Sequence, residues 1–128
     1  MVTAVTEGVR IDVQTIFQDE FSNPMQQHYV FSYRIRIENQ SRVTVQLKRR
    51  FWQIFDGTGI KREVEGEGVV GQQPVLEPGE SYEYVSGCNQ TGSVGKMVGF
   101  YTMERVVDGK QFKVEVPEFN LIVPYRLN

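Results

Sequence analysis

The stretch from Tyr29 to Glu38 has the sequence YVFSYRIRIE, and it decides the fold class. Apolar and polar side chains alternate along it, with Ile35 and Ile37 on one face and Arg34 and Arg36 on the other. This period of two is the signature of a β-strand with one buried face. We therefore expect a strand here that packs its apolar face into a core.

Similar runs occur on both sides of this strand, spaced roughly 8 to 12 residues apart. Turn signals such as Asp108-Gly109, the strongest hairpin dipeptide in the chain, separate them. Pro117 and Pro124 bracket the last run, which confines it to a sheet edge. We expect residues 87–92 to form a loop, Pro78-Gly79 to form a type II turn, and further strands over residues 9–17, 43–55, 60–65, 81–86, 96–107, 110–116 and 119–123.

The segment from Leu47 to Phe55 is ambiguous, because its apolar residues also fit a helical stripe. It is rich in β-branched and aromatic residues and ends in a hairpin-type turn at Asp56–Gly59, so a strand is favoured. A β-bulge near residues 48–50 would shift the alternation and turn Trp52 and Ile54 inward.

The chain is therefore predicted to be all-β, with no substantial helix. The spacing of its strands indicates a sandwich of two antiparallel sheets, of the immunoglobulin or fibronectin III type. A length of 128 residues fits a single domain over residues 1–128.

Composition and charge limit the binding partners and the cellular compartment that we expect. The formal net charge is only −2, which provides no global field to attract nucleic acid or anionic lipid. The apolar runs are no longer than Leu121–Val123, whereas a membrane span needs about 20 residues. Cys88 is the single cysteine and the first residues do not resemble a secretory signal, so we expect a cytoplasmic protein.

Residues Gly66, Gly68 and Gly71 form a Gly-x-Gly-x-x-Gly motif. In a dinucleotide-binding fold, this motif must lead into a helix whose N-terminus holds the pyrophosphate. Here Gln72-Gln73-Pro74 follows, and neither kinase nor Walker signatures accompany the glycines. We favour a structural role, in which the glycines adopt positive φ or admit a close backbone at turns.

An anion-binding role for the same motif is the alternative. Backbone amides of a glycine turn can form an anion nest, and Arg49 and Arg50 could bind phosphate beside Gly66, Gly68 and Gly71. Glu63, Glu65 and Glu67 on the next strand oppose it, and the charges could equally belong to a solvated sheet face. Spacing along a strand is also a poor basis for a magnesium site, so we expect no metal and no cofactor.

Catalysis has no clear set of residues in this sequence. A nucleophilic mechanism would need Cys88 or a serine beside a base, and His28 is the only histidine. No motif surrounds either residue, so we expect no enzymatic activity.

The aromatic residues are the remaining signal: most should fill the core, and any left on a sheet face would mark a partner-binding surface. They are Phe51, Trp52, Phe55, Tyr82, Tyr84, Phe100, Tyr101, Phe112, Phe119 and Tyr125.

Several ordered blocks resemble the ApaG family, in its bacterial stand-alone form. They are FWQIFDG at residues 51–57, VEGEGVVG at residues 64–71, QPVLEPG at residues 73–79, YVSGC at residues 84–88, GKMVGFY at residues 95–101 and FKVEVP at residues 112–117. The resemblance implies a fibronectin III-like sandwich and provides no catalytic residues. Bacterial members carry a label linking them to cobalt and magnesium efflux, and related domains in eukaryotic proteins look like protein-binding modules.

Two functions follow as hypotheses. The leading one is a non-enzymatic module that binds an unidentified protein partner. The alternative is a sensor of a small phosphate-containing anion, such as pyrophosphate or ATP, at the glycine turn. We expect no nucleic-acid or membrane partner, while the edge strand near Leu121–Val123 could pair with a second copy in a homodimer.

Overall fold

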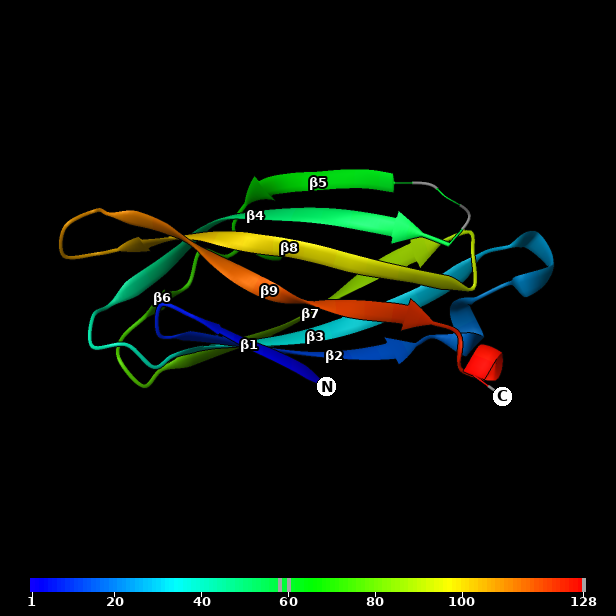
Figure 1. The fold of residues 1–128 in the computed structure, drawn as a ribbon, viewed down its shortest axis with the longest axis horizontal. Coiled ribbons are helices and arrows are strands. Elements are labelled where there is room, and N and C mark those ends of the chain that lie inside the picture. Colours follow the sequence, from blue (N-terminus) through cyan, green and yellow to red (C-terminus); the bar gives the residue numbers. More distant parts are fainter. Residues whose placement is uncertain (58, 60, 128) are drawn as a thin grey trace.

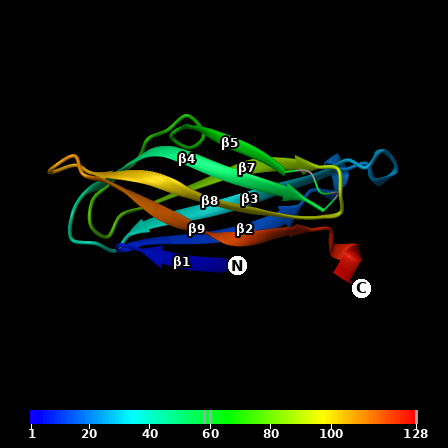
Figure 2. The same ribbon diagram turned by 45° about the horizontal axis from the view of Figure 1, so that its top comes forward.

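The protein folds into two antiparallel sheets packed face to face (Figures 1 and 2). This computed structural model describes residues 1–57, 59 and 61–127. The described residues contain three short 3₁₀ turns and no α-helix: η1 (Asp19–Phe21), η2 (Pro24–Gln26) and η3 (Pro124–Leu127). The strands are β1 (Val2–Thr6), β2 (Val9–Phe17), β3 (Tyr29–Asn39), β4 (Val45–Asp56), β5 (Lys61–Glu67), β6 (Val75–Leu76), β7 (Ser81–Gln90), β8 (Val94–Arg105) and β9 (Gln111–Ile122).

One sheet has the strand order β1-β2-β3-β7, and the other has the order β5-β4-β8-β9 with β6 beside β4. The all-β, two-sheet prediction is confirmed, whereas the fibronectin III type stays a prediction. Figure 2 shows β5 and β7 at the same side of the molecule, one in each layer. These two edge strands frame the candidate site.

The core lies between the sheets and is filled by alternating residues of β2, β3, β4, β7, β8 and β9. Ile35 and Ile37 are fully buried on β3, as their alternation predicted. Trp52 is only 3% exposed, and its ring makes edge-on contacts with Tyr33, Tyr101 and Phe119 at centroid distances of 5.9, 6.1 and 5.8 Å. This aromatic cluster joins both layers.

A bulge in β4 sets which of its side chains face inward. The register between β4 and β8 shifts between Leu47 and Arg49, where the sequence predicted a bulge. Beyond the shift, Trp52 and Ile54 are buried, which confirms the prediction. The same alternation puts Arg50 on the inner face and leaves Arg49 exposed on the outer face.

The prediction of a loop over residues 87–92 is wrong for most of its length. Strand β7 continues to Gln90, because β3 is long enough to pair with it as far as Tyr29. Cys88 and Gln90 keep the inward alternation and are buried. Gly87 signalled a loop, but an edge strand tolerates a glycine at this position.

The predicted separate strand over residues 119–123 is also wrong. It is the second half of β9, which continues through Pro117 at a shift in register with β8. The edge position is confirmed, since β9 is the outermost strand of its sheet. Strand β1 was not foreseen from the sequence.

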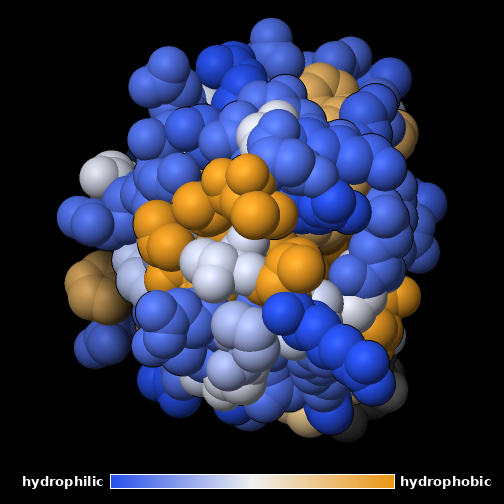
Figure 3. Space-filling view, turned by 90° about the vertical axis from the view of Figure 1, so that its left-hand side faces the viewer, coloured by the Kyte–Doolittle hydropathy of each residue, from blue (hydrophilic) through white to orange (hydrophobic). Residues whose placement is uncertain are grey.

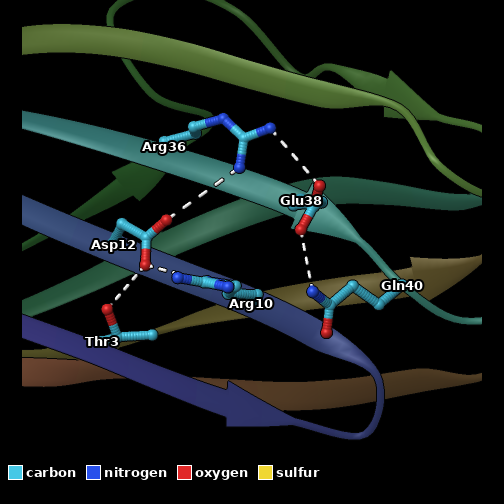
Figure 4. A network of polar contacts seen from close by, with 6 residues as sticks. All are labelled: Thr3, Arg10, Asp12, Arg36, Glu38 and Gln40. Atoms are coloured by element: carbon cyan, nitrogen blue, oxygen red, sulfur yellow. Dashed lines mark hydrogen bonds and ion pairs between the residues drawn. The ribbon is translucent and has the colours of Figure 1, made fainter.

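The outer face of the four-stranded sheet carries a connected polar network (Figure 4). Asp12 accepts hydrogen bonds from Thr3 and Arg10 at 2.7 and 3.0 Å, and Arg36 links it to Glu38. Burial would raise the pKa of Asp12, but these hydrogen bonds and the two arginines outweigh it and hold the pKa below its ordinary value. The charges of this face are therefore paired with one another.

Candidate binding cleft

The glycine motif forms a tight turn after β5. Val69 and Gln72 exchange two backbone hydrogen bonds of 2.8 and 2.9 Å, which closes a two-residue hairpin turn. Both central residues, Val70 and Gly71, have positive φ, at 48° and 76°. Two successive positive φ values are characteristic of a type I′ turn, in which glycine is favoured.

Gly68 is the most constrained glycine of the motif. Its φ is +65°, and a Cβ atom there would lie 2.3 Å from the carbonyl oxygen of Gln72. Its amide donates to the carbonyl of Lys48 at 2.9 Å, which ties the turn to β4. Gly66 has a different role, because a Cβ there would lie 3.2 Å from the Arg50 guanidinium. The absence of a side chain at Gly66 leaves room for Arg50.

The turn directs carbonyl oxygens at Arg50. The Nη1 group of Arg50 donates to the carbonyls of Glu67 and Gly68 at 3.0 and 2.9 Å. The amides of Gly68, Val69 and Gln72 are engaged in backbone hydrogen bonds, so they are not free to form an anion nest.

The structure brings only part of the predicted anion site together. Arg50 contacts Gly66 and Gly68, as the preceding distances show. Arg49 lies on the opposite sheet face, and Gly71 is at the turn tip with open space around it. Anion binding at the turn itself stays a prediction.

A cleft of about 530 Å³ lies on the inner side of β5. Its walls come from β4, β5 and β8 in one sheet and from β3 and β7 in the other. Both edges of the sandwich contribute, so the cleft opens between β5 and β7. It is lined by Tyr33, Arg50, Trp52, Ile54, Arg62, Val64, Ser86, Gly87, Cys88, Asn89 and Met97.

Arg62 spans this opening from β5 to β7. Its Nη2 group donates to the carbonyl of Asn89 at 2.5 Å and to the Cys88 sulfur at 3.4 Å. The register places Arg62 opposite Ile54 on the inner face of the β4–β5 pair. Arg62 therefore holds the two sheet edges together at one end of the cleft, while Arg50 occupies the other.

The cleft carries positive charge without a carboxylate in its lining. Among the described residues, neither Arg50 nor Arg62 forms an ion pair, whereas Arg34 pairs with Glu83 at 3.1 Å and Lys96 with Glu118 at 3.2 Å. The acidic residues of β5 have exposed side chains and lie outside this lining. Asp56 lies beside Arg62 in an adjoining hollow and acts on Cys88, so the field favours an anion most at the Arg50 end of the cleft.

Burial shifts the titration of the polar groups in and behind the cleft. It raises the pKa of Tyr33 and of Tyr101, and the positive charge of Arg50 only partly opposes this rise. Burial likewise raises the pKa of the Cys88 thiol, against the hydrogen bond from Arg62. Cys88 is therefore a neutral thiol at neutral pH, not the thiolate that a nucleophile requires.

The outer face of the five-stranded sheet carries half-buried aromatic rings. Phe51 and Phe100 stack with centroids 5.2 Å apart, and Phe55 lies further along β4. Lys113 lies 4.5 Å from the centroid of the Phe100 ring, and Lys96 lies 5.3 Å from that of Phe55. We name Phe51, Phe55 and Phe100 the aromatic stripe. These are aromatic residues left on a sheet face, the feature by which the sequence predicts a partner-binding surface.

A further apolar area lies at the end of the molecule shown in Figure 3, which is the left-hand end in Figure 1. The tip of the β8–β9 hairpin and the segment between β3 and β4 lie at this end. Val106 and Val107 at the hairpin tip are 51% and 79% exposed, and Val43 is partly buried against the core. Val43, Val106 and Val107 are thus the apolar residues of the hairpin tip and of the segment between β3 and β4.

Arg62 is the functional candidate that sequence reasoning did not select. It is not among the arginines that the anion hypothesis places beside the glycine motif. The hairpin signal at Asp56–Gly59 could have found it, because the resulting register puts Arg62 on the same face as Trp52. In the described part of the chain, no three His, Cys, Asp or Glu side chains gather as metal ligands, and no helix is long and apolar enough to cross a membrane.

Comparisons with known proteins agree with this architecture. The model of the ApaG domain family matches residues 19–105. Protein ApaG of Brucella canis is 50% identical over 124 residues, covering 97% of this chain and 95% of that relative. The crystal structure of the putative ApaA protein from Bordetella pertussis is 42% identical, with a TM-score of 0.87 over 91% of this chain and 94% of that one. The chain therefore belongs to the ApaG family.

Proposed function

We propose that this protein is a non-enzymatic interaction module, which binds a protein partner through the outer face of its five-stranded sheet. The observation that supports the proposal is the aromatic stripe. Phe51, Phe55 and Phe100 are only half-buried although the core has its own aromatic cluster. Aromatic side chains are enriched in the buried centres of protein interfaces, where they contribute most of the binding energy.

The lysines beside the stripe explain how such a face stays soluble without its partner. Lys61 and Lys96 both lie over the Phe55 ring, at 5.8 and 5.3 Å from its centroid. The aliphatic part of a lysine covers apolar surface while its ammonium stays in water, and the long side chain can move aside when a partner binds. A cytoplasmic location is part of the same proposal, since the lone Cys88 has no partner for an internal disulfide. Any link to cobalt or magnesium would then be indirect, through the partner.

Site-specific photocrosslinking tests the proposal. A photoreactive phenylalanine analogue at Phe100 should capture a defined partner, and the variant Phe51→Ser in the same chain should abolish that product. The matched control carries the analogue at Val85, which is exposed on the outer face of the other sheet. Capture of the same proteins from both positions, or capture that is insensitive to Phe51→Ser, would contradict the proposal.

A small-anion sensor at the glycine turn is the second candidate, because Arg50 lies directly against Gly66 and Gly68. Calorimetric titration with pyrophosphate and ATP tests it. The absence of heat at millimolar ligand would end it. A homodimer through the β9 edge stays a prediction that sedimentation at increasing protein concentration can test.

A further inference from the structure

The cleft between β5 and β7 contains two arginines, Arg50 and Arg62, that form no ion pair among the described residues. Arg50 is half-buried and hydrogen-bonds only backbone carbonyls, not a carboxylate, among the described residues. Arg62, at the opening, is more exposed, and it donates to the Asn89 carbonyl and the Cys88 sulfur, again without a carboxylate partner among the described residues. Taking a cation partly out of water is costly unless an opposite charge compensates for the lost hydration. A bound anion would supply that compensation.

We propose that this cleft binds an elongated organic dianion, with one anionic group at Arg50, the other at Arg62, and an apolar middle between them. Carboxylate and phosphate end groups share the required chemistry, because both accept paired hydrogen bonds from a guanidinium. The site is distinct from the aromatic stripe, which lies on the other face of β4. It is also distinct from the nest predicted at the glycine turn, where the amides of Gly68, Val69 and Gln72 are engaged in the backbone.

The spacing of the two arginines sets the length of the ligand. Arg62 pairs with Ile54, which lies four residues beyond Arg50 along β4. At about 3.3 Å per strand residue, the two backbone positions are roughly 13 Å apart along the strand. A compact anion at one arginine would leave the other unpaired, whereas a linear dianion reaches both.

Both guanidinium groups are held in place and still have donors to offer. Each uses a single Nη nitrogen for its hydrogen bonds with the protein. An arginine carries five N–H donors, so each retains a further edge for a ligand. Because the hydrogen bonds already restrict these side chains, ligand binding costs less conformational entropy than it would with free arginines.

The lining between the arginines suits an apolar chain. Trp52, Ile54, Val64 and Met97 provide this part of the surface, and the volume of about 530 Å³ lies within the ordinary range for small-molecule sites. Ser86 and Asn89 add polar groups at the β7 wall. The combination of an apolar floor with a cation at each end is what a linear dianion would recognise.

The single tryptophan makes the test direct. Trp52 is the only tryptophan of the chain and it lines the cleft, so its fluorescence reports on the cleft and on the core packed behind it. Titration of the full chain with decanedioate should change the emission in a saturable way. Decanoate, with one carboxylate, and pyrophosphate, which is compact, should each bind about tenfold more weakly. No saturable change with decanedioate at millimolar concentration, or equal or tighter binding of either control, would overturn the proposal.

Variants distinguish binding in the cleft from a general electrostatic attraction of the anion to the protein. Arg50→Met and Arg62→Met should each weaken decanedioate binding about tenfold or more, and the matched control Arg49→Met on the outer face should leave it unchanged. Arg50→Lys, which keeps the charge but loses the paired donors, should fall between wild type and Arg50→Met. Each variant is compared at temperatures where its melting curve shows it folded. Equal losses in Arg49→Met and Arg50→Met would overturn the assignment.

Discussion

The two faces of β4 use neighbouring residues in opposite ways. Arg49 points outward to a flat, exposed sheet face, where lysines and glutamates are interspersed with the aromatic stripe. Arg50, the next residue, points inward to a concave cleft without a carboxylate in its lining. The two arginines have the same chemistry but different surroundings. Shape and local charge therefore distinguish the face that we propose for a protein partner from the cleft that we propose for a small ligand.

The difference depends on the bulge and on the glycine turn. The register shift after Leu47 decides which arginine faces inward. Gly68 then ties the end of β5 to β4, so that β5 forms a wall over the cleft. Changes to these features should disturb the inner region most, and changes on the outer face should have progressively smaller effects on stability.

The largest effect is expected from Gly68→Val. The new side chain would collide with the carbonyl of Gln72 and would adopt a left-handed backbone that β-branched residues avoid. We expect a loss of about 3 kcal/mol in the free energy of unfolding, measured by urea denaturation. Gly71→Val is the control, because a Cβ there meets nothing within 4 Å and only the backbone strain remains. An equally large loss in Gly71→Val would show that backbone strain alone accounts for the effect. The close approach of Gly68 to the Gln72 carbonyl would then add nothing to stability.

The free energy of unfolding should fall at alkaline pH because of the buried tyrosines behind the cleft. Burial raises the pKa of Tyr101 and of Tyr84, so above about pH 10 the unfolded chain loses protons that the folded chain keeps. The unfolded state then binds fewer protons, so stability falls as pH rises, by about 1 kcal/mol per pH unit for each such tyrosine. Below pH 10 the stabilising contribution is fully present.

Urea denaturation between pH 9 and pH 11 measures this slope, and Tyr101→Phe should flatten it. The same variant leaves the Tyr84 hydroxyl without its hydrogen-bond partner, so it should lose about 1 kcal/mol at pH 7. An alkaline slope unchanged by Tyr101→Phe would show that this tyrosine does not control the transition.

A smaller effect is expected from Phe100→Ser on the outer face. Its ring is half-buried and stacks on Phe51, so stability should fall by about 1 kcal/mol, less than for a fully buried phenylalanine. Partner capture, measured in this variant with the photoreactive analogue at Phe55 instead, should nevertheless be lost. Decanedioate binding should be unaffected, as monitored by Trp52 fluorescence. A Phe100→Ser chain that loses the ligand but keeps the partner would reverse the roles of the two faces.

The smallest effect is expected from Arg49→Met. Its side chain is exposed and forms no ion pair among the described residues, so thermal denaturation should show a change within about 0.5 kcal/mol. Comparison with Arg50→Met under the same conditions then gives the effect of losing the arginine that faces the cleft. Equal stability and equal ligand affinity in both variants would remove the contrast on which the interpretation depends.

The alternation of residues predicted most of this architecture because a sheet with one buried face imposes a period of two. Residues Tyr29 to Glu38, the bulge before Trp52 and the turn at Pro78-Gly79 follow from local sequence, and the structure confirms them. The end of β7 was missed, because glycine and asparagine near Cys88 signal a loop locally while pairing with β3 keeps the strand extended.

The candidate site was harder to predict because it is formed by register and by the packing of two sheets. Gly66 and Arg50 lie together in the structure, but the sequence could not tell that the turn presents carbonyls to the arginine. Arg62 enters the cleft only through its pairing with Ile54. The β7 wall at Ser86–Asn89 comes from the other layer, which no local pattern indicates.

Amide NMR spectra recorded during titration with decanedioate test the central claim most directly, because they monitor both faces of β4 at once. We predict shifts confined to the cleft, at the amides of Arg62, Val64 and residues 86–89, with the outer-face positions Thr102 and Lys113 unmoved. Shifts spread over the outer face, or confined to the turn around Gly71, would contradict the division of β4 into a ligand-binding inner face and a partner-binding outer face.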